Sequence, residues 1–455
     1  MKFKFLTVIS LALAALCADA ATVVNKYAVD TEVCDPVLIY TGGLSKRATW
    51  NKVNLRSYLT HLYADGHRDW FYDAFIFNET NWYDSKTNET RVLVNAGGGQ
   101  LPGTKADWEA FLDHIFADNH DIAALDALIG EWKEKLGEPR LKHKVIIGLC
   151  FPCKDGRGTP KACEWKKFDF GTVNGVDMDF SKEGHRIIAS KWYIDEALRR
   201  FEEKGYKNLE LAGFYCPEET LYTVGSFVKA VNDYIHEKGY RSYWIPYWAN
   251  NDQYALNWKD RYHFDMTWRQ PNYFFYESNG SLPPINQLNS CIRQSKQYGL
   301  GLELEFETSG TSNGMHETSP EMHQRLIDYI DAFEEFGVWD ESGVAHYGGS
   351  KGYCDMAASL DPVNQATMDR LCDIVIRRQN AFAGNTGIED NTVAPEVQFA
   401  YPGTGSIFIP ADFPAASVYN TSGMLVHSGD GTFSCRPGIY IVTDGNGRTV
   451  KVAVK

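Results

Sequence analysis

Residues 300–307 read Leu-Gly-Leu-Glu-Leu-Glu-Phe-Glu. Apolar and acidic side chains alternate along this stretch, and a two-residue period predicts a β-strand because successive side chains point to opposite faces. The apolar face of this strand would carry Leu302, Leu304 and Phe306, and the acidic face Glu303, Glu305 and Glu307.

Seven further runs, each short, apolar or aromatic and flanked by Gly, Pro, Asn or Asp, predict seven more strands. They are residues 37–40, 70–77, 144–151, 208–215, 243–248, 264–268 and 344–347. The intervals between the runs predict helices, among them 105–136 (one helix, or two that break near Asn119), 181–204, 320–336 after the N-cap candidate Ser319, and 361–382.

Eight strands that alternate with helices are parallel strands with helical crossovers, and a closed (β/α)₈ TIM barrel is the simplest α/β solution. A doubly wound open sheet is the rival fold. Such sheets usually carry a glycine-rich phosphate loop after the first strand, whereas here the first strand ends in Tyr40-Thr41-Gly42-Gly43. The sequence therefore favours the barrel.

The two ends of the chain differ in character from the barrel. Residues 1–20 combine two lysines, an apolar run and Ala18-Asp19-Ala20, which predicts a secretory signal peptide; a lipid anchor at Cys17 is the less favoured alternative. We assign residues 21–383 to the barrel, and 384–405, rich in Gly, Asn, Thr and Pro, to a linker. Residues 406–455 alternate short strands with turns and predict a small all-β sandwich domain.

Composition restricts the partners of the protein. A net charge of −14 repels polyanions and makes nucleic acid an unsuitable ligand. No stretch after the N-terminal segment reaches the ~18 apolar residues of a transmembrane span. We expect an exported soluble protein in the periplasm, at the cell surface or outside the cell. Its oligomeric state stays open.

In a TIM barrel the active site lies at the carboxyl ends of the strands. The apolar face of residues 300–307 would meet the outer helices, so its three glutamates would line the barrel interior or mouth. The fourth strand ends near Tyr215, Glu218 and Glu219. Strands four and seven lie on opposite arcs of the barrel, so carboxyl groups at their ends can flank one ligand.

Glycoside hydrolysis needs two such carboxyl groups, one to protonate the leaving oxygen and one to attack carbon or activate water. We assign the acid role to Glu219, with Glu218 second, and the nucleophile or base role to Glu305, with Glu307 second. Glu303 would lie deepest and hold a structural hydrogen bond. The alternative is that Glu218 and Glu219 begin the next helix, where acidic residues suit the helix dipole.

Other strand ends carry aromatic, amide and guanidinium groups that suit a hydroxyl-rich ligand. The candidates for substrate binding are Asp73, Tyr215, Tyr247, Trp248, Asn250, Arg269, Gln270, Asn272, Tyr273 and Glu303. Loops that simply pack their aromatic residues, and a buried paired Asp73, are the structural alternatives. Tyr347 and Gly348-Gly349 could form the floor of the site.

The sequence predicts no metal and no cofactor. Cys150, Cys153 and Cys163 lie close in sequence but lack an obvious fourth zinc ligand, so we interpret them as thiols or one local disulfide. His316, Glu317 and His323 lack the spacing of a zincin motif.

Several of these segments together resemble the bacterial domain-of-unknown-function family 4855 over roughly residues 35–380. The segments are 70–75, Gly213-Phe214-Tyr215 with Glu219, 244–247, 270–273 and 303–305. The resemblance implies a barrel-shaped, glycosidase-like domain in secreted proteins of polysaccharide-degrading bacteria. Cys216 departs from the expected aromatic residue. Residues 418–455 are similar to C-terminal sandwich modules of secreted Bacteroidetes-type proteins, some of which serve in sorting.

The hypothesis is a secreted glycoside hydrolase that acts on a polysaccharide or oligosaccharide through carboxylates at the ends of strands four and seven. The alternatives are a non-catalytic glycan-binding barrel and a metal-dependent barrel hydrolase such as a deacetylase.

Overall fold

The structure is a computed structural model that divides into two units, Met1–Gly387 and Ile388–Lys455. The residues that it describes are 32–42, 49–84, 89–94, 101–152, 170–221, 225–247, 256–275, 280–308, 320–349, 351–383, 400–403, 405–410, 415–420, 424–443 and 449–454. The expected signal peptide lies outside the described residues. Within them, no helix has both the length and the apolar character needed to cross a membrane.

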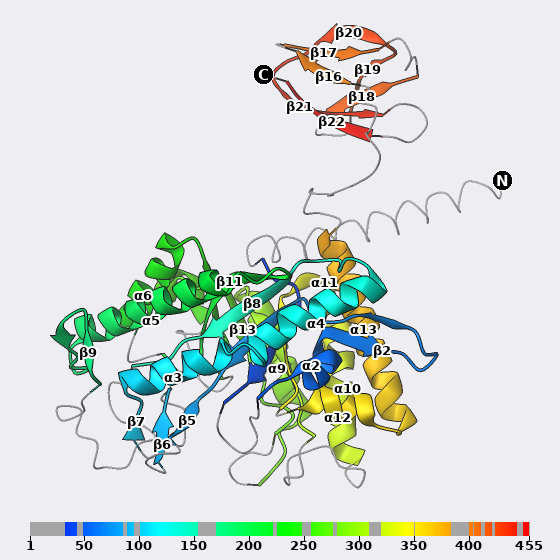
Figure 1. Ribbon diagram of the computed structural model, residues 1–455. Coiled ribbons are helices and arrows are strands. Elements are labelled where there is room, and N and C mark those ends of the chain that lie inside the picture. The colour runs from blue at the N-terminus through cyan, green and yellow to red at the C-terminus, as the bar shows by residue number, and fades with distance from the viewer. Residues whose placement is uncertain are drawn as a thin grey trace. The chain divides into compact units, whose positions relative to one another are not determined.

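The first unit contains a closed barrel of eight parallel strands, each beside its neighbour in chain order (Figure 1). The strands are β1 (Pro36–Tyr40), β4 (Ala74–Asn78), β8 (His143–Gly148), β11 (Leu209–Cys216), β12 (Arg241–Trp244), β13 (Met266–Arg269), β14 (Gly301–Glu305) and β15 (Val344–Tyr347). Pairing of β15 with β1 closes the ring. The predicted TIM barrel is confirmed.

Helices surround the strands (Figure 1). They are α2 (Lys52–Leu59), α3 (Lys105–Ile115), α4 (Asp121–Leu136), α5 (Glu183–Lys204), α6 (Gly225–Glu237), α8 (Trp258–Tyr262), α9 (Ile285–Gln297), α10 (Pro320–Glu335), α11 (Val338–Glu341), α12 (Gly352–Ala358) and α13 (Pro362–Ala383). The segment 105–136 is two helices. The first begins with a capping box between Thr104 and Asp107, which satisfies free amide groups at the helix start.

The single strand predicted over residues 70–77 is wrong in its extent. Its first residue closes β3 (Arg68–Trp70), which pairs with β2 (Thr60–Leu62), and the barrel strand begins only at Ala74. Further small sheets are formed by β5 (Asn81–Asp84), β6 (Glu89–Val92) and β7 (Leu101–Pro102), and by β9 (Thr172–Val173) and β10 (Val176–Asp177).

Two apolar layers separate the inside of the barrel from its outside. Inward residues such as Leu38, Tyr243 and Trp268 form one buried cluster. Outward residues such as Leu302 and Leu304 pack with the helices in a larger cluster. The cluster to which a strand residue belongs therefore tells on which side of the barrel its side chain lies.

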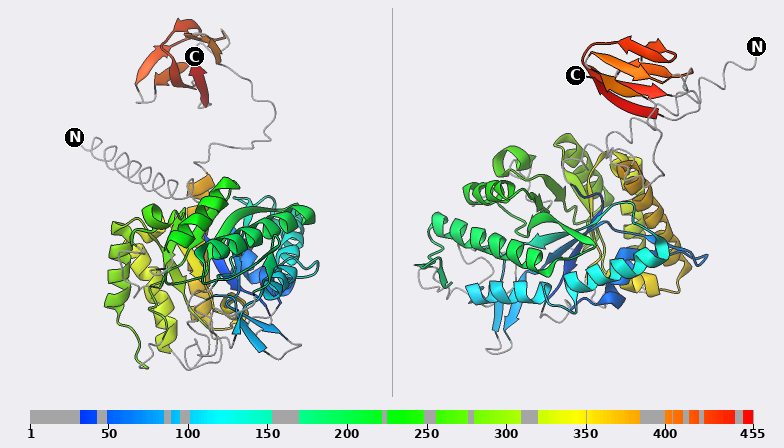
Figure 2. Two further views of the ribbon diagram at one scale, coloured as in Figure 1. Left: turned by 90° about the vertical axis from the view of Figure 1, so that its left-hand side faces the viewer. Right: turned by 45° about the horizontal axis from the view of Figure 1, so that its top comes forward.

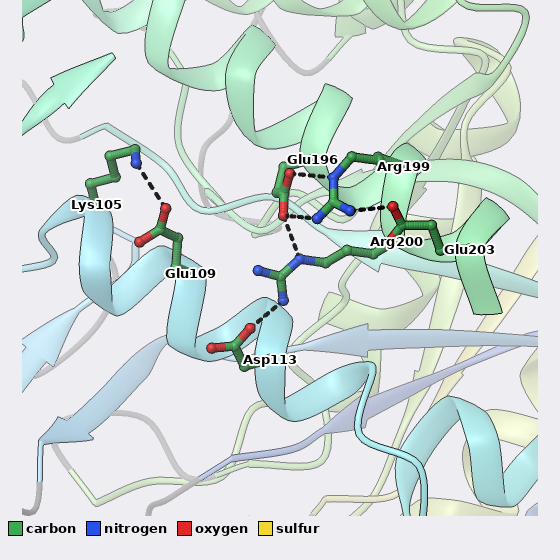
Figure 3. Close-up of polar contacts among 7 residues, drawn as sticks. All are labelled: Lys105, Glu109, Asp113, Glu196, Arg199, Arg200 and Glu203. Atoms are coloured by element: carbon green, nitrogen blue, oxygen red, sulfur yellow. Dashed lines mark hydrogen bonds and ion pairs between the residues drawn. The ribbon is translucent and has the colours of Figure 1, made fainter. Parts of the chain in front are cut away.

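Ion pairs link neighbouring helices at the surface. Glu196 on α5 accepts hydrogen bonds from Arg199 and Arg200, and Arg200 also contacts Asp113 on α3 (Figure 3). The hydrogen bonds from Arg199 and Arg200 lower the pKa of Glu196 to about 2 even though burial raises it. The pairs fasten α3 to α5.

A buried charge network lies at the amino ends of the strands. Asp35, just before β1, accepts a hydrogen bond of 2.8 Å from Arg378 of α13 and lies 3.2 Å from Nε2 of His346. Burial raises the pKa of Asp35, but Arg378 and His346 outweigh it and hold the pKa below the usual value. Because Asp35 and Arg378 are both buried, loss of either would leave the charge of the other uncompensated.

The second unit is a β-sandwich of two antiparallel sheets (Figure 2). One contains β16 (Tyr401–Gly403), β17 (Ser406–Ile409) and β20 (Gly431–Ser434), and the other β18 (Ser417–Asn420), β19 (Leu425–Ser428), β21 (Gly438–Thr443) and β22 (Thr449–Val454). Ile407, Val418 and Val442 lie in its core. Strand β16 falls within the predicted linker, and its Pro402 is tolerated because the strand lies at a sheet edge.

The Arg378–Asp35 pair predicts a large stability effect. We expect Arg378→Met to lower the free energy of unfolding by roughly 3–5 kcal/mol, because it leaves a buried carboxylate without its cation. Urea denaturation at neutral pH measures the effect. Arg377→Met is the matched control, since Arg377 is half-exposed and lies 3.4 Å from Glu334 at the surface, where a pair contributes at most about 1 kcal/mol. Equal losses in both variants would contradict the role given to the network.

Candidate active site

Two glutamates of β14 point into the barrel. In the sheet, Glu303 pairs with Ala345 and Glu305 with Tyr347, and both partners belong to the inner cluster or pack against it. The intervening Leu302 and Leu304 pack in the outer cluster. Glu303 is 1% exposed and Glu305 is fully buried. Strand alternation thus places two carboxyl groups inside the ring, Glu305 nearer its carboxyl end.

A bulge in β11 decides which side chains of that strand face inward. The pairing with β8 shifts register between Leu211 and Gly213. Ala212 and Tyr215, three residues apart, both belong to the inner cluster. A regular strand would place residues two apart on the same face, so the bulge is what turns Tyr215 inward.

Only glycine fits at the bulge. Gly213 has φ +159°, and a Cβ atom there would lie 1.9 Å from the carbonyl oxygen of Arg241 on β12. Every larger residue would push β11 and β12 apart at this point. Gly213 therefore fixes the orientation of the residues that follow it.

The two glutamates after β11 lie in different surroundings. Glu218 is 5% exposed, and its carbonyl accepts a hydrogen bond from the indole of Trp244. Burial and, to a smaller extent, the charge of Glu218 raise the pKa of the outward-facing Cys216. Glu219 is half-buried, and burial raises its pKa. The charge of Glu219 contributes to the raised pKa of both Glu303 and Glu305, so its carboxyl group lies within electrostatic reach of both.

Glu305 is held by hydrogen bonds from two neighbouring elements. The hydroxyl of Tyr329 on α10 and the backbone amide of Asn272 after β13 both donate to Oε2 at 2.7 Å. Asn272 adopts φ +50°, a left-handed conformation that asparagine tolerates better than most residues. These donors fix the position of one carboxylate oxygen and favour its charged form.

The buried carboxyl groups hold protons more tightly than ordinary glutamates. Burial raises the pKa of Glu305 to about 8, against the lowering effect of Tyr329, Asn272 and the Gln270 side chain. Burial and the charges of Glu305 and Glu219 raise the pKa of Glu303 well above its usual value. Within the described residues, neither oxygen of Glu303 has a hydrogen-bond partner. A buried Glu303 with a raised pKa, next to a Glu305 whose Oε2 atom is held in place, is an arrangement suited to proton transfer.

Aromatic and amide groups surround these carboxyl groups on the inner face. Tyr40 and Tyr347 pack against the inner cluster with their rings 5.7 Å apart. Tyr247 bridges to Gln270 at the ends of β12 and β13, and the Asn272 amide lies 3.4 Å from the Tyr247 hydroxyl. Asn78 pairs with Tyr40 across β4 and β1. Such rings and donors suit a ligand with apolar faces and hydroxyl groups.

Several predicted site residues are not brought to this group. Asp73 lies at the amino end of β4, where it accepts hydrogen bonds from the backbone of Cys34 and Asp35. This corrects its assignment to substrate binding, because the two ends of a strand face opposite ends of a barrel. Burial and the charge of Asp35 raise the pKa of Asp73 to about 6.

The assignments of Arg269 and Tyr273 to substrate binding are corrected as well. Arg269 is 1% exposed and contacts Gln294 on α9, because it follows the inward Trp268 and so points outward. The hydroxyl of Tyr273 donates to Asp328 at 2.6 Å, and its ring lies 3.8 Å from the Arg325 guanidinium, both on α10.

Glu307 lies past the end of β14. Its carboxyl group occupies the space where a Cβ atom of Gly349 would be, beyond β15, and it accepts a hydrogen bond from the Thr308 amide. Trp248 and Asn250 lie outside the described residues.

Sequence reasoning did not select Asn78, Tyr40 or Tyr329. The strand pattern offered a signal for the first two, since each is the last residue of its strand and shares a face with Leu38 or Ile76. Neither polar atom of the buried Asn78 side chain has a partner among the described residues. Tyr329 gave no signal, because it reaches Glu305 from a helix.

Possible metal ligands gather elsewhere. In the described part of the chain, His114, His120 and Asp121 form the grouping with suitable ligand atoms, next to Thr41 on the outer side of β1. The partners of Asp121 in this grouping, Thr41 and Trp50, differ from the partners of Glu305, which are Asn272 and Tyr329.

The bulge predicts a sharp difference between two glycines. Gly213→Ala should abolish folding or displace β11, because the new methyl group would collide with backbone. Gly205→Ala at the end of α5 has a left-handed φ of +56° but open space, so it should cost only about 1 kcal/mol. Thermal unfolding of both variants checks this. A Gly213→Ala protein as stable as the Gly205→Ala protein would refute the constraint.

Comparison with solved structures finds matches of low identity and low TM-score. An endo-β-1,4-mannanase from Thermotoga petrophila is 13% identical, with a TM-score of 0.41, over 93% of this chain and 98% of the other. A GH18 chitinase from Pseudoalteromonas aurantia is 10% identical, with a TM-score of 0.35, over 71% and 98%. The tryptophan synthase α subunit of Legionella pneumophila is 9% identical, with a TM-score of 0.30, over 80% and 98%.

The sequence itself gives a more specific result. No curated protein matches it significantly. A family model described as a domain of unknown function, DUF4855, matches residues 35–373, a range that spans the barrel from β1 to α13. The chain belongs to the DUF4855 family.

Proposed function

We propose that this protein is a glycoside hydrolase that acts on a polysaccharide or oligosaccharide. The observation that carries the proposal is the pair of buried inward carboxyl groups, Glu303 and Glu305, whose pKa values are raised by burial and by the charge of Glu219. Burial of a carboxyl group is costly, and glycoside hydrolysis is a reaction that uses carboxyl groups with raised pKa values.

Glu219 is proposed as the general acid. It is half-buried, and burial raises its pKa, which favours the protonated form that a general acid needs. Glu219 is preferred to Glu218 because its charge raises the pKa of both inward glutamates, whereas Glu218 lies beside the outward Cys216.

Glu305 is proposed as the nucleophile or base. Its Oε2 atom receives two hydrogen bonds that favour the charged form, which leaves Oε1 to approach a sugar carbon or a water molecule. Glu303 lies deeper and is proposed to stay protonated, so that it adds no second negative charge beside Glu305. The tyrosines around them are proposed to contact the sugar rings. Export through residues 1–20 would bring the enzyme to extracellular glycans.

Paired variants test these roles. The purified protein is screened against polysaccharides and aryl glycosides, beside Glu219→Gln and Glu305→Gln. We expect kcat on a glycan to fall by about 10²–10⁴-fold in each. On an aryl glycoside with a good leaving group, Glu219→Gln should lose far less, because that leaving group needs no protonation, whereas Glu305→Gln should stay impaired.

The control is Glu210→Gln, which lies on the same strand as the bulge but pairs with Lys142 at the surface and should leave kcat unchanged. Turnover that survives both Glu219→Gln and Glu305→Gln would remove the proposal. Glycan binding without any turnover would instead favour a binding protein.

The pH dependence gives a second test. The proposed active form has Glu305 charged and Glu219 protonated, so kcat/KM should follow a bell in which Glu219 sets one limb above the usual glutamate pKa of about 4.3 and Glu305 sets a limb near pH 8. Tyr329→Phe removes a hydrogen bond that lowers the pKa of Glu305, so this limb should move to higher pH and the maximum should fall.

Tyr193→Phe is the control for this shift. Tyr193 is also buried on a helix, but its hydroxyl donates to the carbonyl of Gly148 and not to a carboxylate. A limb that stays in place in Tyr329→Phe, or that moves equally in Tyr193→Phe, would contradict the role of Tyr329.

A further inference from the structure

We infer that His114, His120 and Asp121 form a binding site for one Zn²⁺ ion that holds together the elements around the carboxyl end of β1. The three residues come from the last turn of α3, the residue before α4 and the first residue of α4. One ligand atom from each lies within 4.8 Å of the others. This inference does not depend on the proposed glycosidase activity.

The spacing of the ligand atoms fits zinc. Oδ2 of Asp121 lies 3.1 Å from Nε2 of His114 and 3.4 Å from Nδ1 of His120. Zinc bonds of ~2.0–2.2 Å to nitrogen and oxygen in a tetrahedron separate neighbouring ligand atoms by about 3.3 Å. Two imidazoles and a carboxylate are also the ligand types that zinc prefers over calcium or magnesium.

The hydrogen-bond partners of Asp121 leave one of its carboxylate oxygens beside the imidazoles. Oδ1 of Asp121 is already occupied by the backbone amide of Trp50 at 2.9 Å, so Oδ2 alone faces the imidazoles. Nδ1 of His120 is buried and has no hydrogen-bond partner in the part of the chain that the structure describes. The Thr41 hydroxyl donates to Oδ2 at 2.7 Å and lies 3.0 Å from His114 Nε2. A second hydrogen bond to each carboxylate is how proteins orient metal ligands.

The backbone at Asp121 adopts a strained conformation. Asp121 has φ +46° and no exposure, although it is the first residue of a helix. Residues in this region cost of order 1–3 kcal/mol and persist where the surrounding structure holds them. The residue held in this conformation is the one whose Oδ2 atom lies beside both imidazoles.

A zinc ion here would join segments that are far apart in the sequence. Thr41 follows β1, Trp50 precedes α2, and the indole of Trp50 donates to the carbonyl of Tyr40 at 2.9 Å. Tyr40 itself packs on the inner cluster beside Tyr347. The ion would therefore stabilise the first strand end from its outer side, as a structural metal does.

Metal titration of the full chain tests the site. Chelator-treated protein is titrated with zinc chloride by calorimetry, and thermal unfolding is followed with and without zinc. We expect one tight site per chain that raises Tm. In His120→Gln, and in His114→Gln, the affinity of that site should fall by at least about 100-fold, since loss of a ligand costs more than loss of an outer partner.

The matched control is His67→Gln, because His67 also lies beside a carboxylate, Asp65, but is exposed and outside the cluster. It should keep the wild-type affinity. Thiols that bind zinc elsewhere are present in all variants, so the difference between variants reports this site. The visible absorption of Co²⁺ bound in place of zinc should show tetrahedral coordination in the wild type and lose it in His120→Gln.

The result that overturns the inference is zinc affinity that is unchanged in both His120→Gln and His114→Gln, or the lack of any tight site. If His114→Gln fails to fold, the cobalt spectrum and affinity of His120→Gln decide alone.

Discussion

The lack of a side chain at residue 213 is the constraint on which the inner face of the barrel depends. A Cβ atom there would lie 1.9 Å from the Arg241 carbonyl, so β11 and β12 can approach only if this residue is glycine. The resulting bulge changes the alternation along β11 and directs Tyr215 inward. Without the bulge, Phe214 would face the interior and the polar residues beyond it would meet a different environment. Bulges often serve to direct a side chain in this way.

Buried acidic residues have different partners at the amino ends of the strands and on the inner face of the barrel. At the amino ends of the strands, Asp35 is paired with Arg378, and Asp73 accepts two backbone hydrogen bonds. On the inner face, Glu303 has no partner among the described residues, and Glu305 receives donors on one oxygen only. A paired acid contributes to stability, whereas an unpaired one lowers it and is retained where its raised pKa is used. The proposed site is therefore distinct from the network at the amino ends of the strands, the end of a barrel that contributes mainly to stability.

The fold could be predicted from the sequence because it rests on repetition. Eight apolar runs separated by helical stretches each add one strand, and an error in one boundary, as at residues 70–77, leaves the count unchanged. The orientation of Glu303 and Glu305 could be predicted for a similar reason, because β14 is regular and its alternation continues to the end of the strand. The role of Tyr329 could not be predicted, because its contact with Glu305 joins a helix of the outer layer to a strand.

Residue chemistry alone misleads where direction matters. Arg269 and Tyr273 follow an aromatic strand end, as site residues often do, yet both turn toward the helices. Because Trp268 faces inward, the alternation of a strand, or parity, predicts that the next residue faces outward. The assignment was wrong because it relied on residue type, whereas parity would have given the right orientation. Parity in turn fails on β11, because a register shift cannot be read from residue types until the close approach of Gly213 to β12 is known. Selecting a barrel's reactive residues therefore requires locating its bulges first and its polar side chains second.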